Sequence, residues 1–270
     1  MRILGRQPAR IAAALCNPSY YVGLLEVAKV FHRPLGFYYN YVFHRGHFPA
    51  RYSVRTPAGE VSFDLYHIED LLTANEIFAR LDYKCSKDAK VIVDIGANIG
   101  LASLYFLTRS RDSFVYAFEP VPLNVERFRK NLNGFEDRYE LAQQAVAVRP
   151  GTVDFGIEPT GRLGSLADDA REGSVSERDY QKYIKVSAVT INDALWRILD
   201  KSGQIDLLKV DVEGTEAELV AALLPEIRRK IERMHVEWQF TENPIADTHV
   251  LKQGGAVATF YRIAARALQN

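Results

Sequence analysis

The alternation of hydrophobic and polar positions changes near residue 90, and the predicted structure changes with it. Beyond this point, short apolar runs rich in β-branched residues alternate with segments of helical spacing. The predicted strands are "KVIVDIG", "SFVYAFEP", "YELAQQAVAV", "IDLLKVDVEG" and "RMHVEWQF", and the predicted helices cover 99–109, 122–132, 190–201 and 215–231. Apolar strands that alternate with helices are typical of a parallel sheet covered on both faces, so we predict a doubly wound, Rossmann-like α/β fold.

The chain before residue 86 follows other patterns and is predicted to be an N-terminal extension, residues 1–85, to a main domain, residues 86–270. Its first 50 residues are rich in aromatic side chains and predict one or two helices, broken near Pro34-Leu35-Gly36. "RYSVRTPAGEVSFDLY" alternates around a Pro-Ala-Gly turn and predicts a β-hairpin, and "IEDLLTANEIFARLDY" has helical spacing. Within the main domain, residues 151–190 read as an insertion of short strands around a polar loop.

Charge and cysteine content narrow the class of protein. The formal net charge is +0, so no overall field draws the chain to nucleic acid or to an acidic membrane. Cys16 and Cys85 are too few for a disulfide framework, and reduced cysteines fit a cytoplasmic location. Arginines at positions 2, 6 and 10 before "IAAALC" resemble the start of a signal peptide, but the apolar run is short. With no apolar run of about 18 residues, we expect no membrane span.

The segment "VIVDIGANIG" predicts a strand, a tight turn and a helix start. Its spacing is shorter than the G-x-G-x-x-G of dinucleotide-binding turns, and Asp94 at the strand end would repel a diphosphate. An acid there suits a ligand with a cationic amino acid part, such as S-adenosylmethionine. We expect Asp94 to favour the ligand's ammonium, and backbone N–H groups of the turn and helix start to bind its carboxylate.

Glu119 ends the next predicted strand, "YAFEP". A carboxylate at that position can accept hydrogen bonds from both hydroxyls of a ribose. NAD-dependent enzymes use the same device, so Glu119 alone does not distinguish the two cofactors.

Four segments together, "VIVDIGANIG", "YAFEPVPLNVERFRKNL", "TINDAL" and "DLLKVDVEGTEAELV", resemble the FkbM-type methyltransferases. The resemblance spans roughly residues 60–245, and "DLYHIEDLLTANEIF" is similar to the family's segment before the first strand. It implies a class I methyltransferase sheet and S-adenosylmethionine-dependent methylation of a hydroxyl, often on a sugar or polyketide.

The resemblance also implies a set of site residues. Those that it assigns to the methionine part of the cofactor are Asp94, Gly96, Asn98 and Gly100. It assigns Glu119 to the ribose, Gln143 or Gln144 to the adenine, and Asp211 and Glu213 to the neighbourhood of the methyl group. After "HVEWQF" only a short helix and one clear strand, "VATFYRI", are predicted, so we expect the family's closing antiparallel pair to be incomplete.

Four residues at strand ends are candidates for catalysis, because a hydroxyl acceptor must lose a proton. They are Asp211, Glu213, His235 and Glu237. His235 and Glu237 share one face of a predicted strand and suit a base and its orienting partner, although a core histidine and a paired glutamate fit the same pattern. Carboxylates could hold Mg²⁺, but no spacing demands a metal, and we predict none. Glu76 either folds over the cofactor or is a helix-surface charge.

Two other functions remain open on the sequence alone. One is a nicotinamide-dependent oxidoreductase, which predicts a full G-x-G-x-x-G that is absent. The other is a catalytically inactive methyltransferase fold that serves as a binding subunit. The expected partner is a small-molecule or glycan hydroxyl acceptor rather than nucleic acid. The N-terminal aromatic residues suit core packing, a homo-oligomer contact, a membrane-surface face or an acceptor-binding lip.

Overall fold

The computed structural model describes residues 25–157, 164–166, 182–212 and 214–263 of the 270-residue chain. The chain forms two compact units, Met1–Lys84 and Cys85–Asn270. The domain boundary after residue 85 stays a prediction, because compactness alone does not establish independent folding.

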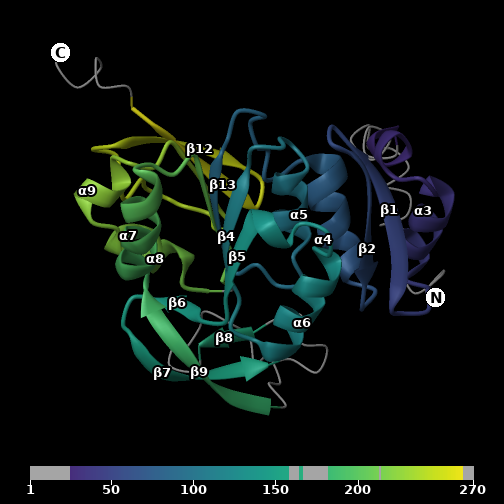
Figure 1. The fold of residues 1–270 in the computed structure, drawn as a ribbon, viewed down its shortest axis with the longest axis horizontal. Helices are drawn as coiled ribbons and strands as arrows, with labels where there is room; N and C mark the ends of the chain where they lie inside the picture. Colours follow the sequence, from purple (N-terminus) through teal and green to yellow (C-terminus); the bar gives the residue numbers. More distant parts are fainter. Residues whose placement is uncertain (1–24, 158–163, 167–181, 213, 264–270) are drawn as a thin grey trace. The chain divides into compact units, whose positions relative to one another are not determined.

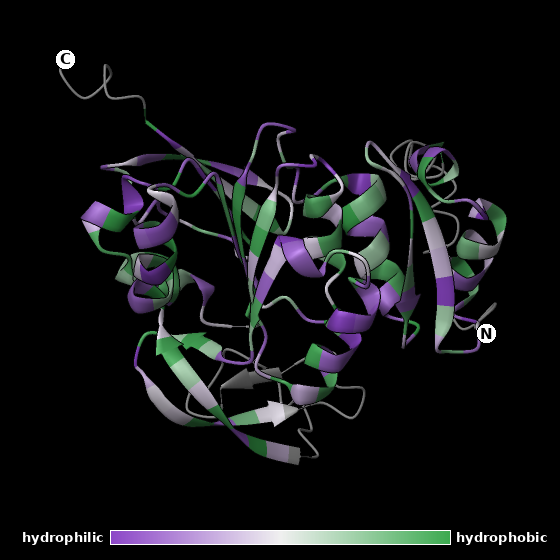
Figure 2. Ribbon diagram, viewed as in Figure 1, coloured by the Kyte–Doolittle hydropathy of each residue, from purple (hydrophilic) through white to green (hydrophobic). Residues whose placement is uncertain are grey.

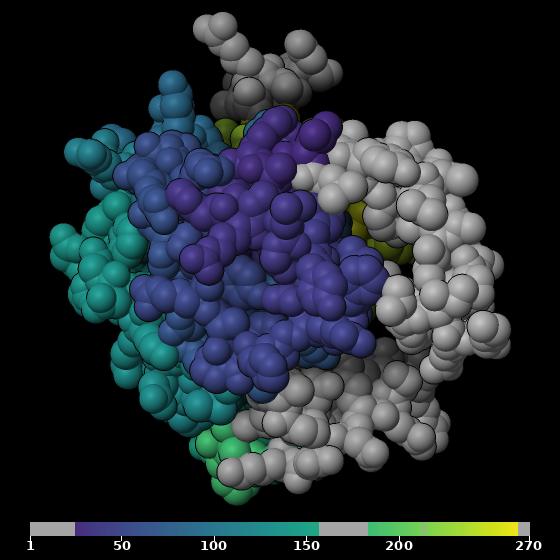
Figure 3. All heavy atoms as spheres, turned by 90° about the vertical axis from the view of Figure 1, so that its right-hand side faces the viewer, coloured from purple at the N-terminus to yellow at the C-terminus, as the bar shows by residue number. Residues whose placement is uncertain are grey.

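The described part of the first unit, residues 25–84, combines short helices with one hairpin. A helix over 25–30 is followed by α3 (Pro34–Phe43), so the predicted break before Pro34 is present. The predicted hairpin is also present, as strands β1 (Ala50–Thr56) and β2 (Gly59–Leu65) in antiparallel register. Residues of this unit appear purple and blue in the space-filling view of Figure 3.

The last helical segment of the first unit is irregular. α4 (Asp70–Ala74) continues directly as a π-helix, η1 (Asn75–Arg80), where a single helix was predicted. Phe78 of η1 stacks on Phe63 of β2 at 5.1 Å between ring centroids, which fixes this helix on the hairpin.

The second unit is built on a seven-stranded sheet in the order β12-β13-β11-β10-β3-β4-β5 (Figure 1). Its strands are β3 (Val91–Ile95), β4 (Phe114–Phe118), β5 (Tyr139–Ala142), β10 (Leu207–Val210), β11 (Arg233–Val236), β12 (His249–Gly254) and β13 (Val257–Arg262). β3, β4, β5, β10 and β11 pair in parallel, and β13 is antiparallel to both of its neighbours. The predicted doubly wound α/β fold is confirmed. The strand order reverses at β3, between β4 and β10.

The expectation that the closing antiparallel pair is incomplete is wrong. β12 and β13 form a hairpin in which His249 pairs with Arg262 and Gly254 with Val257. The sequence hides β12 because it is an edge strand with mostly exposed residues, so it lacks the apolar alternation that marks a half-buried strand.

Three predicted elements are divided or shortened. "YELAQQAVAV" is two strands, because the chain leaves the main sheet after Ala142 and re-enters pairing as β6 (Ala145–Ala147). The predicted helix 215–231 is α8 (Glu216–Ala222) and α9 (Pro225–Arg228), because Pro225 cannot continue a helix. Strand β11 ends at Val236, where Trp238 N–H donates to the Val236 carbonyl and turns the chain.

The predicted insertion forms a separate sheet with β6. Its strands are β7 (Gly151–Ile157), β8 (Gly164–Leu166) and β9 (Lys182–Thr190), in the order β6-β9-β7-β8. A small apolar cluster that includes Ala145, Phe155 and Val186 packs within this sheet.

Helices cover the main sheet on both faces, and Figure 1 shows α7 (Ile191–Ser202), α8 and α9 on one side and α5 (Leu101–Leu107) on the other. The other helices in the described residues of this unit are α6 (Pro122–Asn131) and the 3₁₀ turn η2 (Glu136–Arg138). Thr190 caps α7 by accepting a hydrogen bond from the Asp193 N–H. In Figure 2, α7–α9 carry both hydrophobic and hydrophilic residues, as expected of helices with one face on a sheet.

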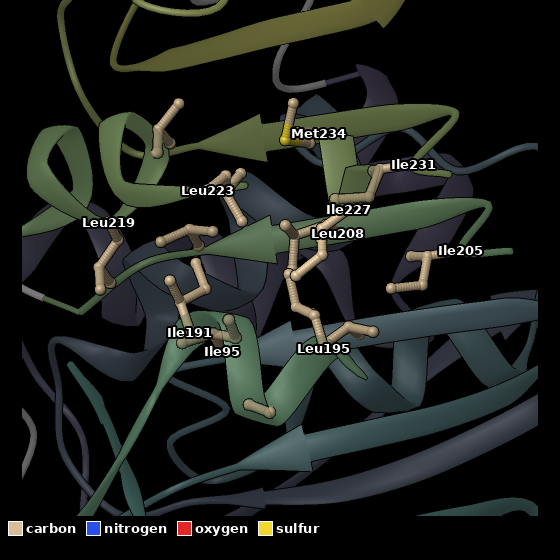
Figure 4. Packing of buried hydrophobic residues seen from close by; sticks show 14 of the residues in the cluster. Ile95, Ile191, Leu195, Ile205, Leu208, Leu219, Leu223, Ile227, Ile231 and Met234 are labelled. Carbon is tan, nitrogen blue, oxygen red and sulfur yellow. The ribbon is translucent and has the colours of Figure 1, made fainter. Parts of the chain in front are cut away.

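The core between the sheet and α7–α9 is drawn in Figure 4. Ile95, Leu208 and Met234 come from three neighbouring strands, and Leu195 and Ile227 come from the helices that cover them. Since strand residues alternate between the faces, the residues next to these in sequence, Asp94, Lys209 and His235, lie on the opposite face.

Cys85 is a free, buried thiol, and burial raises its pKa to about 12. Cys16 lies outside the described residues. Within the described part of the chain, no helix has both the length and the apolar character needed to cross a membrane.

Candidate active site

The carboxyl ends of three adjacent parallel strands, β4, β3 and β10, meet at the point where the strand order reverses. In open α/β sheets, ligands bind outside the strand ends at such a switch point. Asp94 of β3, Glu119 after β4 and Asp211 after β10 are brought to this edge, as the sequence predicted.

The turn after β3 satisfies its own backbone donors. Gly96 and Ala97 both donate to the Phe118 carbonyl at 3.0 Å, Asn98 N–H donates to Glu119 at 2.9 Å, and Gly100 donates to Ala97. Asn98 adopts a left-handed conformation, with φ of 49°. The N–H groups of these four residues thus have acceptors within the protein, and the assignment of Gly96, Asn98 and Gly100 to the methionine part of the cofactor stays a prediction.

The two glycines of the turn are explained by packing inside the protein. Both have positive φ, +76° at Gly96 and +87° at Gly100. A Cβ at Gly96 would lie 1.7 Å from the Asp211 carbonyl oxygen, and one at Gly100 would lie 2.5 Å from Leu132 and 2.8 Å from Phe128. Gly96 thus allows β3 and β10 to end in contact, and Gly100 allows α6 to pack on the turn.

Glu119 organises the turn from the neighbouring strand. One carboxylate oxygen accepts from Asn98 N–H, and the other accepts from Val121 N–H at 2.9 Å and from the Asn124 side chain at 3.3 Å. Burial raises the pKa of Glu119 to about 7, although each of these hydrogen bonds, and more weakly the charge of Lys209, lowers it. Its assignment to a ribose stays a prediction, and the structure adds that the same carboxylate links β4, the turn and the start of α6.

A buried lysine joins the two acids at the switch point. Lys209 Nζ lies 3.1 Å from Asp94 Oδ1 and 3.2 Å from Asp211 Oδ2, and donates to the Gly96 carbonyl at 2.9 Å. Asp94 is fully buried, and its Oδ2 accepts a hydrogen bond, at 2.7 Å, from the Ser103 hydroxyl. We call Asp94, Lys209 and Asp211 the switch-point cluster.

Sequence reasoning missed Lys209, although a signal was present. A lysine in the middle of the apolar run "DLLKV" is expensive to bury unless it is paired, and acids end both this strand and its neighbour. What the sequence could not supply was the register that places Lys209 opposite Asp94.

Glu216, at the start of α8, holds the loop after β10. Glu216 is buried. Its carboxylate accepts hydrogen bonds from Val212 N–H at 3.0 Å and from Gly214 N–H at 3.0 and 3.2 Å. Burial raises its pKa. Glu213, a candidate catalytic residue, lies outside the described residues.

His235 on β11 and Glu237, the residue that follows the strand end, lie in different surroundings. His235 is buried, with Nδ1 3.1 Å from Thr259 Oγ1 on the neighbouring strand β13. Glu237 follows the strand end and is exposed. β11 ends at Val236, so Glu237 lies just beyond the strand, where its N–H donates to the Val210 carbonyl of β10 at 3.0 Å, and the prediction that it shares a face with His235 stays a prediction.

The predicted cofactor contacts away from the switch point lie on several elements. Gln143 and Gln144 lie between β5 and β6, with Gln143 exposed and Gln144 donating to Ser187 at 3.2 Å. Glu76 belongs to the first unit and pairs with Arg80 one turn along the helix. Among the residues that the structure describes, no group of three or more His, Cys, Asp or Glu side chains is arranged to hold a metal ion.

A family model, the methyltransferase FkbM domain, matches residues 94–257. This chain belongs to the FkbM methyltransferase family. It is thus an S-adenosylmethionine-dependent methyltransferase, and the matched region contains the turn after β3, the switch-point cluster and β11.

Several curated proteins are similar to this chain at low identity. "Methyltransferase 1" of Beauveria bassiana is 26% identical over 75% of this chain and 84% of its own length. The "2-O-methyltransferase NoeI" of Sinorhizobium fredii is 30% identical over 50% of this chain and 58% of its own. The "31-O-demethyl-FK506 methyltransferase FkbM" of Streptomyces tacrolimicus is 26% identical over 54% and 65%.

Among solved structures, a methyltransferase from Geobacter sulfurreducens superimposes with a TM-score of 0.40 and 18% identity, covering 70% of this chain and 79% of that chain.

Proposed function

We propose that this FkbM-family methyltransferase transfers the methyl group of S-adenosylmethionine to a hydroxyl group of a small molecule or glycan, such as a sugar or a polyketide. The observation that carries the proposal is the switch-point cluster beside Glu119. The names of two relatives, a 2-O-methyltransferase and a 31-O-demethyl-FK506 methyltransferase, support oxygen as the acceptor atom.

The chemistry of the cluster suits the methionine part of this methyl donor. Two carboxylates and one ammonium leave one net negative charge, which favours a cation. Asp211 is the member that a ligand can reach, because 26% of its side chain is exposed while Asp94 is fully buried. We therefore assign the donor's ammonium to Asp211, and we assign Asp94 an indirect contribution through Lys209.

The adenosine part would lie along the neighbouring strands. Glu119 is proposed to accept a hydrogen bond from the ribose through Oε2, which accepts from Asn98 N–H and has a second lone pair, whereas Oε1 already accepts from Val121 N–H and the Asn124 side chain. Gln143 or Gln144, after β5, is proposed to lie along the adenine. Gly96, Asn98 and Gly100 would then serve by shaping the turn.

When bound, the methyl donor supplies an electrophilic methyl carbon. This chain must hold the acceptor hydroxyl in line and remove its proton. Glu237 is the exposed carboxylate beside the strand ends, and we propose it as the base. His235 and Glu213 remain candidates for the same step, while Asp211 is better suited to hold the donor because its Oδ2 is already committed to Lys209.

A titration of the full-length protein with S-adenosylmethionine tests the cofactor proposal. We expect binding of the donor and of its demethylated product and none of NADH. Glu119→Ala should weaken donor binding by about 1.5–3 kcal/mol, roughly ten- to a hundredfold. The exposed Glu140→Ala on β5 serves as the control. Absence of donor binding by the wild type would refute the proposal.

Methyl transfer itself is tested with donor that carries a deuterated methyl group. The protein is incubated with sugars and polyketides that carry free hydroxyls, and products are analysed by mass spectrometry. A deuterated methyl ether is the expected product. Donor binding without transfer to any hydroxyl would instead favour the alternative of an inactive fold that serves as a binding subunit.

A further inference from the structure

The ammonium of Lys209 is enclosed by protein acceptors. Lys209 is the third residue of β10, and its Cα is in register with Asp94 on β3 and with His235 on β11. Its side chain is 3% exposed. An ammonium has three N–H donors, and three oxygens surround this one at 2.9–3.2 Å: the Gly96 carbonyl, Asp94 Oδ1 and Asp211 Oδ2. Lys209 is therefore placed to act on a ligand through other residues.

The charge on Lys209 is maintained despite its burial. Burial lowers its pKa, but Asp211 and Asp94 together outweigh that effect and leave the pKa raised. Lys209 thus stays cationic over the working range of an enzyme. Without it, two carboxylates at the ends of neighbouring strands would face each other across the switch point without a compensating charge.

Lys209 also contacts three residues, Asp94, Gly96 and Asp211, that backbone contacts connect only in part. The turn after β3 contacts the end of β10 where Gly96 meets the Asp211 carbonyl, and Asp211 N–H donates to Ile95. These contacts fix the backbone of Asp211. They do not fix its side chain, whose Oδ2 is held by Lys209.

We propose that Lys209 is a positioning residue for the methyl donor: it fixes the Asp211 carboxylate at the strand end and neutralises Asp94, so that a single negative charge faces the donor's cationic end. This inference rests on the proposed binding of S-adenosylmethionine at the switch point. It assigns to Lys209 an effect on donor affinity that is separate from its effect on stability.

The test compares Lys209→Met, Asp211→Asn and the double variant by calorimetric titration with S-adenosylmethionine, at a temperature where circular dichroism shows each to be folded. Each single variant should lose about tenfold or more in affinity. Because Lys209 acts through Asp211, the double variant should lose little more than the worse single variant. Losses that multiply would overturn the proposal.

Lys209→Met leaves Asp94 buried without its cation, so a charge-compensated variant, Asp94→Asn with Lys209→Met, separates folding from positioning. We expect it to recover most of the urea stability lost by Lys209→Met while donor affinity stays at least about tenfold below the wild type. Wild-type affinity in this compensated variant would show that Lys209 is only structural. Failure of the wild type to bind the donor would instead refute the proposed function.

Discussion

Gly96 and Asp211 are in such close contact that a Cβ on Gly96 would lie 1.7 Å from the Asp211 carbonyl oxygen. The turn after β3 and the end of β10 therefore meet backbone to backbone, and a side chain at position 96 would force them apart. The glycine is required by the protein's own structure before any ligand is considered.

Replacement of Gly96 by alanine should destabilise the fold. We expect a loss of at least about 2 kcal/mol beyond that of Gly203→Ala, measured by urea unfolding followed by circular dichroism. Gly203 is a matched control, because it has the same φ of +76° but nothing within 4 Å of its Cβ position. It thus reports the cost of a positive φ without a steric contact, roughly 1–2 kcal/mol. Equal losses in the two variants would show that the contact with Asp211 is readily relieved.

The buried carboxyl of Glu119 should make stability depend on pH. Its pKa is raised from 4.5 to about 7, so between these values the folded state binds a proton that the unfolded state has lost. The contribution of Glu119 to stability therefore falls as pH rises from about 4.5 to 7 and is constant above. The expected fall is about 3 kcal/mol.

The comparison with Glu119→Gln isolates this effect from other titrating groups. Unfolding free energies of both proteins are measured at several pH values from 4.5 to 8, and the wild type should lose stability relative to the variant over that range. The Gln variant should be less stable than the wild type at the acidic end. Its amide NH₂ cannot accept a hydrogen bond, so one of the backbone N–H groups that now donate to Glu119 would lose its acceptor. A difference that stays constant with pH would refute the raised pKa.

Removal of the Glu216 carboxylate should loosen the loop after β10. Glu216→Ala leaves the N–H groups of Val212 and Gly214 without their acceptor, and we expect a loss of about 1–3 kcal/mol in unfolding free energy. Amide hydrogen exchange at Gly214 should become faster. The control is Glu226→Ala, an exposed acid in the first turn of α9. Unchanged exchange at Gly214 would show that the loop is held by other contacts.

The predictions about catalysis concern the carboxylates of Glu237 and Asp211. Glu237→Gln keeps shape and removes basicity, so turnover should fall about a hundredfold or more with donor affinity nearly unchanged. Asp211→Asn should lower both donor affinity and turnover, because its proposed partner is the donor's ammonium. The measurement is steady-state kinetics alongside titration. Full turnover in both variants would remove these residues from catalysis and leave the cofactor proposal standing.

Addition of excess chelator to the wild type tests the prediction that no metal takes part. Turnover should be unchanged. Loss of activity that Mg²⁺ restores would indicate a cation held by carboxylates near the strand ends.

The amino-acid pattern was sufficient to predict the fold class and the sheet edge that holds the candidate site. Continuous apolar strands such as β3 and β10 must be buried on both faces, so their alternation with helices was sufficient to predict a doubly wound sheet. Because parallel strands end at one edge, the positions of Asp94, Glu119 and Asp211 at strand ends were also sufficient to predict that they gather there. The edge strand β12 was not predicted, because most of its residues are exposed and it therefore lacks the alternation of apolar and polar residues that marks a half-buried strand.

The contacts among these residues became known only from the folded structure. The register between β3 and β10 places Lys209 beside Asp94, and the side chain of Lys209 then reaches Asp211 and Gly96. Register depends on packing and pairing across more than a hundred residues of sequence, which a local pattern does not contain. For the same reason, the sequence could place Gly96 in a turn but could not show that Asp211 is the neighbour that requires it.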